Sequence, residues 1–278
     1  MKSAPFEYLA ATSVAEVVTA LTGDDGAKIL AGGQSLMPLL AMRLARPTLV
    51  VDINGLGLDA VVLEATVLRL GALVRHRRLE RDQTVARVAP VLSDAARLIG
   101  HPAIRNRGSI GGSLAHADPA AELPAVLVAT GGTVVAEGPR GSREVAELFD
   151  GFLTTTLEPD ELLVEVRIPV PAGRAGGAFC EWAPRCGDFA EVGVAVTVTV
   201  DPDGILTSVG AAACGVGSVP IPLDDAFAAT IGVGALSPVA LSSIAAVVAA
   251  ECAGAEGDRA ALAGLLAARA LVRAMRRA

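Results

Sequence analysis

Two short runs of small residues, both rich in glycine, constrain this chain more than any other feature of its sequence. The first is Ala31-Gly32-Gly33-Gln34-Ser35-Leu36, and the second lies in the stretch RNRGSIGGSLAHADPAAELP, residues 105–124. Residues without a bulky side chain let the backbone fold closely around an anion and direct N–H groups toward it. Most short glycine clusters are only turns between strands. Two runs that each adjoin an apolar segment nevertheless predict that both face one ligand.

Composition limits the class of ligand and partner. The chain has 278 residues, of which 52% are hydrophobic, so it can bury a large core and form two or three compact units. It carries 23 basic and 30 acidic residues with no basic stripe, which argues against nucleic acid as a partner. Lys2 and Lys28 are the only lysines, and the arginines that make up the rest suit fixed ion pairs and phosphates.

Cysteine spacing argues against a metal site. Cys180, Cys186, Cys214 and Cys252 are too unevenly spaced for zinc or iron–sulfur ligation, and only three histidines accompany them. We expect no metal ligand, and reduced cysteines in a cytoplasmic protein. We expect no signal peptide, because residues 1–7 lack an apolar segment. Residues 226–250 carry no charge, but glycines and a proline interrupt them, which predicts a loop and a buried helix and no membrane span.

The first 55 residues predict an αβ-loop-αβ unit. A capping-box pattern at Ser13–Glu16 starts a helix that Gly23 ends. Strands are expected over 28–31 and 48–53, with the first glycine run and a short helix between them. This arrangement puts the run at the carboxyl end of a strand, where open α/β units commonly bind ligands.

A second glycine pattern, Gly55-Leu56-Gly57-Leu58-Asp59-Ala60, fits one form of the dinucleotide-binding fingerprint. That fingerprint requires a helix to follow. Residues 61–70 are rich in β-branched residues and predict a β-hairpin instead. We therefore reject the fingerprint, and no P-loop motif occurs either.

Further along, helices are predicted over 75–82, 86–98 and 121–130, and strands over 133–136, 144–145 and 161–169. Prolines 169 and 171 and the glycines at 173, 176 and 177 mark the best domain boundary. Beyond it, strands over 179–182, 193–200 and 205–214 predict an antiparallel meander, followed by a helix through 262–272.

With these elements in place, the chain resembles the FAD-binding medium subunit of the molybdenum hydroxylases, the family of xanthine and carbon monoxide dehydrogenases. The resemblance is carried, in order and over nearly the whole chain, by ILAGGQSL (29–36), IGHP (99–102), GSIGGSL (108–114), ADPAAELP (117–124) and RCGDFA (185–190). Several motifs in sequence are far more specific than any one of them.

The resemblance implies an α+β fold. An FAD-binding domain over residues 1–172 would consist of two α/β-type subdomains, 1–55 and 56–172, of the type shared with vanillyl-alcohol oxidase. A C-terminal domain over 178–278 would hold a three-stranded antiparallel sheet and helices, with FAD between the domains.

The resemblance also implies a set of cofactor-binding residues and no catalytic residue in this chain. Glu122 would contact ribityl or ribose hydroxyls, although an acid at a helix N-terminus is also favoured by the helix dipole. Leu163 would pack on the cofactor but would be apolar in any buried strand, and Asp118 before Pro119 is also an ordinary turn residue. The implied residues are Ile29, Leu30, Ala31, Gly32, Gly33, Gln34, Ser35, Leu36, Ser109, Ile110, Gly111, Gly112, Ser113, Asp118, Glu122 and Leu163.

Seven other positions stay open. Cys180 stands where some relatives carry a lysine, and His116 lies close enough to the second run to touch a cofactor. Arg105 and Arg107 could approach a phosphate or a partner subunit, or form surface ion pairs. The few aromatic residues Tyr8, Trp182 and Phe189 could stack on a flavin, but each is expected to be a core residue.

The function that the resemblance implies is electron transfer. A large subunit with a molybdopterin cofactor would oxidise the substrate, and a small subunit with two [2Fe–2S] clusters would pass electrons to FAD in this chain, in a dimer of heterotrimers. NAD⁺, oxygen or a quinone could accept the electrons. The alternatives are a stand-alone flavin oxidase of the vanillyl-alcohol oxidase type and a non-catalytic flavin-binding scaffold.

Overall fold

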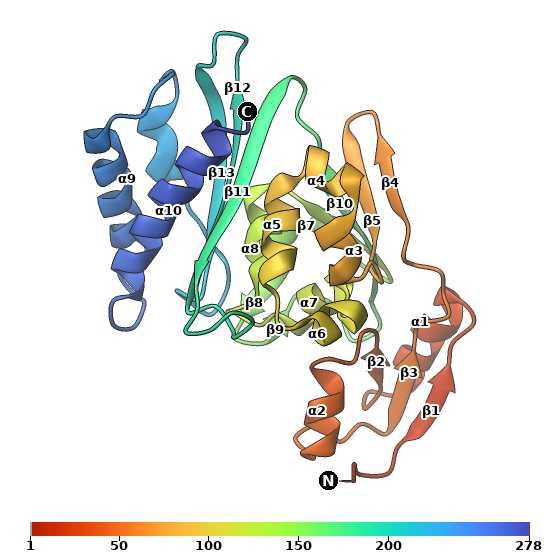
Figure 1. Ribbon diagram of the computed structural model, residues 1–278. Helices are drawn as coiled ribbons and strands as arrows, with labels where there is room; N and C mark the ends of the chain where they lie inside the picture. The colour runs from red at the N-terminus through yellow and green to blue at the C-terminus, as the bar shows by residue number, and fades with distance from the viewer. Residues whose placement is uncertain (1) are drawn as a thin grey trace.

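The computed structural model describes residues 2–278, which form three successive parts (Figure 1). A small N-terminal unit, drawn in red and orange, lies at one corner of the molecule. A sheet with several short helices occupies the middle, and a second sheet backed by two long helices forms the opposite side. This mixed arrangement of helices and sheets confirms the expected fold class.

The N-terminal unit is a parallel sheet of order β1-β3-β2 with two helices. Helix α1 begins where the Ser13 side chain accepts a hydrogen bond from the Glu16 N–H, while the Glu16 carboxylate accepts one from the Thr12 N–H at 2.7 Å. The predicted cap is therefore confirmed, and Val17 and Leu21 face the core. The elements are β1 (Glu7–Ala10), α1 (Val14–Gly23), β2 (Lys28–Leu30), α2 (Leu36–Ala41) and β3 (Leu49–Asp52).

The central sheet is antiparallel, with strand order β4-β5-β10-β6-β7. Its first two strands form the predicted hairpin, in which Val61 pairs with Leu70. Because strands stand where the dinucleotide fingerprint would need a helix, rejecting that fingerprint was correct. The elements are β4 (Val61–Glu64), β5 (Val67–Gly71), β6 (Thr133–Glu137), β7 (Arg143–Glu144) and β10 (Leu162–Pro169).

Six helices cover this sheet, and two expectations about them are wrong. The single helix predicted over 86–98 is broken at Ala89, because Pro90 has no N–H and starts a new helix. The second glycine run is not a loop, because Gly111 and Gly112 form the first turn of α7. The helices are α3 (His76–Arg81), α4 (Gln83–Val88), α5 (Pro90–Leu98), α6 (Pro102–Arg107), α7 (Ile110–His116) and α8 (Glu122–Ala129).

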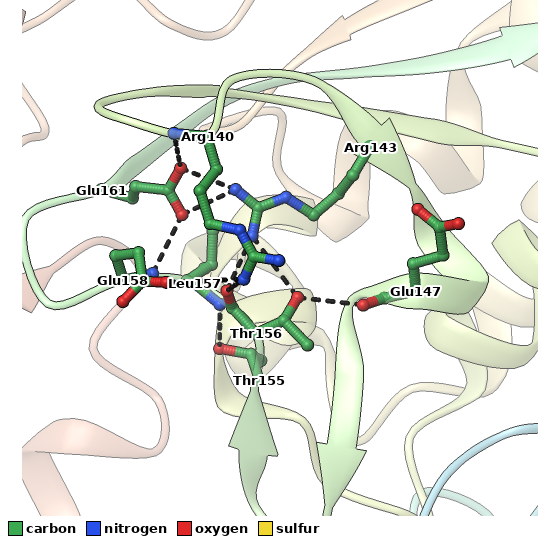
Figure 2. A network of polar contacts seen from close by, with 8 residues as sticks. All are labelled: Arg140, Arg143, Glu147, Thr155, Thr156, Leu157, Glu158 and Glu161. Carbon is green, nitrogen blue, oxygen red and sulfur yellow. Dashed lines mark hydrogen bonds and ion pairs between the residues drawn. The ribbon is translucent and has the colours of Figure 1, made fainter.

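A buried ion pair joins Arg143 on β7 to Glu161 at the start of β10, and Arg143 also donates to the Thr156 carbonyl, directly after the small hairpin β8–β9 (Figure 2). Arg143 Nη2 lies 2.6 Å from both Glu161 oxygens, and the two side chains are 8% and 0% exposed. The carboxylate also accepts the N–H groups of Arg140 and Glu158, each at 2.9 Å. Burial opposes ionisation, but these donors hold the pKa of Glu161 below its usual value. The additional elements are η1 (Val145–Glu147), β8 (Phe149–Gly151) and β9 (Thr154–Thr155).

The C-terminal sheet has order β11-β12-β13-β14, in which three long antiparallel strands carry a two-residue edge strand. Gly176 and Gly177, expected in a linker, lie inside β11, and the turn before it is shorter than predicted. The elements are β11 (Arg174–Trp182), β12 (Val192–Val200), β13 (Leu206–Cys214), β14 (Ile221–Pro222), η2 (Asp224–Thr230), α9 (Pro238–Glu251) and α10 (Arg259–Met275).

The two faces of this sheet belong to different cores. Because side chains alternate along a strand, Phe179 and Cys214 join the core of the central part, with α5 and α8. Cys180 and Val194 face the other way, into a core shared with α9 and α10. The predicted loop and helix in 226–250 are present, but α9 is only half-buried because one side of it packs on α10. No helix within residues 2–278 meets the length and apolarity that a membrane span requires.

Candidate functional site

The first glycine run follows β2 directly and leads into α2. Gly33 has φ +71°, a left-handed conformation that residues with a side chain rarely adopt. The Gln34 side-chain amide donates to the Gly32 carbonyl at 3.0 Å, and Met37 N–H donates to the Gly33 carbonyl at 3.0 Å. The turn is therefore built before any ligand arrives, as a binding loop needs to be.

The second run forms the N-terminus of α7, where Ser109 is the cap residue. Its hydroxyl accepts the Gly112 N–H at 3.3 Å, while the Ile110 and Gly111 N–H groups donate to Val74 and Ala72 carbonyls. These N–H groups are thus committed inside the protein, contrary to the expectation that glycines 111 and 112 would present them to an anion. The glycines serve close packing instead, since a Cβ on Gly111 would lie 2.7 Å from the Ala72 Cβ.

The two runs meet at Gly32. A Cβ on Gly32 would lie 2.8 Å from the Gly108 Cα and closer still to the Arg107 carbonyl oxygen. On the far side of Gly108, a Cβ would lie 2.8 Å from Nδ1 of His76. Two backbone segments from different parts of the molecule therefore touch because neither carries a side chain there.

A pocket of about 430 Å³ opens beside this contact. Asp52 forms one wall, and its carboxylate accepts hydrogen bonds from the Tyr8 hydroxyl at 2.7 Å and the Asn54 N–H at 2.8 Å. Burial opposes ionisation of Asp52, but these donors and the Arg107 charge hold its pKa below the usual value. The lining residues are Leu30, Ala31, Gly32, Gly33, Gln34, Met37, Pro38, Asp52, Asn54 and Arg107.

The structure separates the two arginines that the sequence left undecided. Arg105 is buried and structural: its guanidinium lies 3.0 Å from Glu80 and also donates to the Ile99 and Gly100 carbonyls. Arg107 lines the pocket, and its guanidinium forms no ion pair or hydrogen bond with any residue in 2–278. It is therefore the cation available to an anionic ligand.

His76 packs against Gly108, at the contact between the two glycine runs. It is 6% exposed, its N–H donates to the Gly108 carbonyl at 3.0 Å, and neither ring nitrogen has a hydrogen-bond partner. Burial lowers the pKa of His76 to about 4, and the charges of Arg75 and Arg105 lower it further. The imidazole is thus neutral at physiological pH and acts through packing.

Asp118 and Glu122 lie at the opposite end of α7 from the glycines. Asp118 accepts the Ala120 N–H at 2.9 Å, which is the ordinary role of a turn residue. Glu122 begins α8 and is 7% exposed, and burial raises its pKa to about 8, with Glu181 and Asp118 adding to the rise. The helix α7 therefore separates the two glycine runs, near its start, from a buried acid beyond its end.

Other expected site residues lie elsewhere. Leu163 is in the core of the central part and does not line the pocket. Cys180 faces α10, where Arg273 donates to its sulfur at 3.4 Å. The expectation that Tyr8, Trp182 and Phe189 are core residues is wrong, because they are 58%, 55% and 72% exposed.

Sequence reasoning missed three residues of this region. Asp52 and Asn54 follow β3, and their place after a strand beside the first glycine run was a usable signal. Glu181 was overlooked in favour of its neighbour Cys180, although strand alternation puts only one of them on the face toward α8. A second cavity, of about 440 Å³, lies between α8 and the C-terminal sheet. His76 and Glu181 have buried polar atoms without a hydrogen-bond partner, but neither residue lines this cavity.

Comparison with known proteins gives consistent matches. The family described as FAD binding domain in molybdopterin dehydrogenase matches residues 4–171. The chain is 44% identical over 230 residues to the 6-hydroxypseudooxynicotine dehydrogenase complex subunit alpha of Paenarthrobacter nicotinovorans, covering 81% of this chain and 78% of the relative. It is 34% identical over 284 residues to the carbon monoxide dehydrogenase medium chain of Afipia carboxidovorans, covering 98% of each.

A solved structure agrees with these matches. Carbon monoxide dehydrogenase from Hydrogenophaga pseudoflava, in a form that lacks the Mo-pyranopterin moiety of its cofactor, superposes with a TM-score of 0.93 and 34% identity. The superposition covers 100% of this chain and 99% of that chain.

Proposed function

The chain belongs to the family of FAD-binding domains in molybdopterin dehydrogenases, and from that premise we propose that it relays electrons from a partner subunit to an external acceptor. It is thus an FAD-binding medium subunit of an oxidoreductase complex. FAD, when bound, supplies a two-electron carrier that can exchange electrons singly or in pairs. The chain itself supplies binding, orientation and electrostatics.

The observation that carries the proposal is the contact between the two glycine runs at Gly32 and Gly108, beside the unpaired Arg107. The absence of a side chain at Gly32 lets the Arg107–Gly108 backbone pack directly on the first glycine run, which brings both segments to one wall of the pocket. The Arg107 guanidinium gives the same pocket a cation, which suits a pyrophosphate. Ile29 to Leu36 and Ser109 to Ser113 are accordingly proposed to hold FAD, with Asp118, Glu122 and Leu163 at its other end.

We place the remaining redox groups in partner subunits. The chain's four cysteines do not have iron–sulfur ligand spacing, and residues 2–278 contain no group of three or more potential metal ligands. The proposed partners are a molybdopterin-binding large subunit and a small subunit with two [2Fe–2S] clusters, assembled as a dimer of heterotrimers. FAD is proposed to lie between a flavin domain, 1–172, and a C-terminal domain, 178–278.

An absorbance spectrum of the purified full chain, with extraction and mass analysis of any released cofactor, tests flavin binding. The proposal expects FAD, either bound as purified or taken up when added. Mixing the loaded chain anaerobically with its reduced partner subunits then tests the relay, which expects bleaching of the flavin bands. Bound flavin that its partners never reduce would favour the non-catalytic scaffold, and a chain that binds no FAD would overturn the proposal.

A further inference from the structure

One half-buried arginine joins the N-terminal unit to the central part of the molecule beside the pocket. Arg75 immediately precedes α3, and its Nη2 donates to the side-chain oxygen of Asn54 at 2.6 Å. Its Nη1 donates to the Arg107 carbonyl at 2.5 Å. Asn54 follows β3 in the N-terminal unit, whereas Arg107 ends α6 in the central part. A single guanidinium therefore forms hydrogen bonds to both units.

Asn54 extends this link to the first glycine run. Its side-chain amide nitrogen donates to the Ala31 carbonyl at 2.9 Å and to the Asp52 carboxylate at 2.6 Å. An amide whose nitrogen donates in this way presents its oxygen as the acceptor for a guanidinium, so both ends of the group are satisfied. A continuous series of hydrogen bonds therefore runs from Ala31, at the start of the first run, through Asn54 and Arg75 to the Arg107 carbonyl.

The far end of this series is the contact between the two runs. The Arg107 carbonyl oxygen that Arg75 binds is the atom nearest to the position of a Cβ on Gly32. The backbone of Arg75 also pairs with Ser109 in an isolated antiparallel bridge, at the start of α7. Arg75 is thus fixed to the second run by its backbone and to the first run by its side chain. Asn54 and Arg107, its two side-chain partners, both line the pocket.

The apolar contact between the two units uses other residues. Leu73 and Leu162 of the central part pack in one core with Val17 and Leu21 of α1, and none of these four lines the pocket. Apolar packing is non-directional, whereas a hydrogen bond constrains both a distance and an angle. The link through Arg75 therefore adds a fixed direction to this junction at the end where the pocket opens.

We propose that Arg75 is a positioning residue of the flavin site, which holds Asn54 and the Arg107 carbonyl at a fixed separation so that the two glycine runs form one pocket. This inference rests on the proposed function, and it adds a residue that does not itself line the pocket. A guanidinium suits this role because its planar fork meets two acceptors in fixed directions. A lysine ammonium is a point charge on a flexible stem and does not reproduce that geometry.

A purely electrostatic role for Arg75 is the alternative. Burial and, next, the nearby charge of Arg107 lower the pKa of Arg75, so two cations lie close together at this side of the pocket. If Arg75 acted only by attracting phosphate, a lysine in its place would serve as well. Arg75→Lys keeps the charge and breaks the two-point link, so the two roles predict opposite results for this variant.

The test is the affinity of the full-length apoprotein for FAD, titrated by flavin fluorescence. Arg75→Lys and Arg75→Met are each expected to weaken binding by about tenfold, the effect of losing one hydrogen-bonded link. Asn54→Ala should weaken binding by a similar factor. The double variant with Arg75→Met should bind no more weakly than the weaker single variant, because both substitutions break the same link. Arg81→Lys and Arg81→Met, at the exposed end of α3, are the matched controls and should bind as wild type does.

Hydrogen exchange of the full-length apoprotein, measured by mass spectrometry, is a second measurement that needs no flavin. Peptides that cover residues 29–36 and 105–113 should exchange faster in Arg75→Lys than in wild type or in Arg81→Lys. Peptides from α10 should exchange at the wild-type rate, because local opening at the pocket does not unfold the C-terminal helices. This pattern distinguishes positioning from a general loss of stability, which would speed exchange in α10 as well.

The outcomes separate this inference from the proposed function. If wild type binds FAD and Arg75→Lys binds it equally well, Arg75 acts as a charge and only this inference fails. If wild type binds no FAD, the proposed function fails and takes the flavin role of Arg75 with it, while hydrogen exchange still shows whether Arg75 holds the two runs together. Additive losses in the double variant, or faster exchange throughout the chain in Arg75→Lys, also overturn the inference.

Discussion

The carboxylate of Asp94 on α5 lies 2.6 Å from the guanidinium of Arg277 at the end of the chain, 183 residues away. Arg273, one helical turn earlier, reaches the same carboxylate at 3.4 Å. Arg277 also donates to the Gly177 carbonyl on β11, so one arginine ties the last helix to two parts of the fold. These bonds thereby join the C-terminal sheet and the end of the chain to the central part of the fold.

Replacing Asp94 with alanine removes this clamp. We expect the free energy of unfolding to fall by about 2 kcal/mol, because the carboxylate is almost buried and two arginines lose their acceptor. Chemical denaturation monitored by circular dichroism measures it. Glu64→Ala, which breaks the exposed pair with Arg69, is the control and should change stability by less than about 0.5 kcal/mol. Equal losses of stability in the two variants would show that the Asp94 ion pairs stabilise the fold no more than an exposed ion pair does.

A side chain at Gly32 should separate the two glycine runs. In Gly32→Ala the Cβ would lie 2.8 Å from the Gly108 Cα, and neither backbone can yield without moving the pocket wall. We expect FAD affinity to fall by at least about tenfold in a fluorescence titration. Gly254→Ala is the matched control, since nothing lies within 4 Å of the added atom. An unchanged affinity in Gly32→Ala would show that the contact between the two glycine runs does not shape the binding site.

Arg107 should contribute a charge to phosphate binding. A charge-assisted hydrogen bond is worth about 1.5 to 3 kcal/mol, so Arg107→Ala is expected to weaken FAD binding by about tenfold or more. Affinity in the variant should also depend less on salt concentration. Isothermal titration at two ionic strengths measures both effects, with the exposed Arg97→Ala on α5 as control. Riboflavin, which lacks the phosphates, should bind both proteins equally.

Buried His76 should make the folded chain sensitive to acid. Its pKa is about 4 when folded and 6.5 when unfolded, so its full contribution is present above pH 6.5 and is lost as the pH falls toward 4. That loss amounts to about 3 kcal/mol and should be absent in His76→Gln. Urea denaturation at pH 7 and pH 4 measures the difference, with the exposed His101→Gln as control. A gap between wild type and His76→Gln that does not change with pH would contradict the prediction.

Glu122 should have the opposite effect at higher pH. Its pKa is raised from 4.5 to about 8 by folding, so its contribution is full below pH 4.5 and is lost as the pH rises through 8. Glu122→Gln cannot ionise, and relative to wild type it should gain about 4.5 kcal/mol of stability between pH 4 and pH 9. Denaturation of the apoprotein at these two pH values measures the change. If the difference in unfolding free energy between wild type and Glu122→Gln is the same at both, folding does not raise the pKa of Glu122.

The sequence by itself determined the family, most elements and the first glycine run. These follow from local patterns: the cap at Ser13, the hairpin over 61–71 and the alternation along the C-terminal strands each depend on neighbouring residues. It also predicted Glu122 as a site residue, through the order of its motifs. It did not find the helix at Gly111 and Gly112, because glycine-rich segments have little helical preference and the cap at Ser109 acts only once Ala72 and Val74 are in place.

Only the tertiary structure decided which polar groups are free. Arg105 and Arg107 are two residues apart, and the sequence gives no reason to distinguish them. In the structure Arg105 forms an ion pair with Glu80, whereas Arg107 lines the pocket. Likewise, Asp94 and Arg277 lie 183 positions apart and become partners only when the segment after α10 reaches α5. Partners of this kind come from segments distant in sequence, and burial, which sets both pKa values and binding strength, is a property of the assembled core.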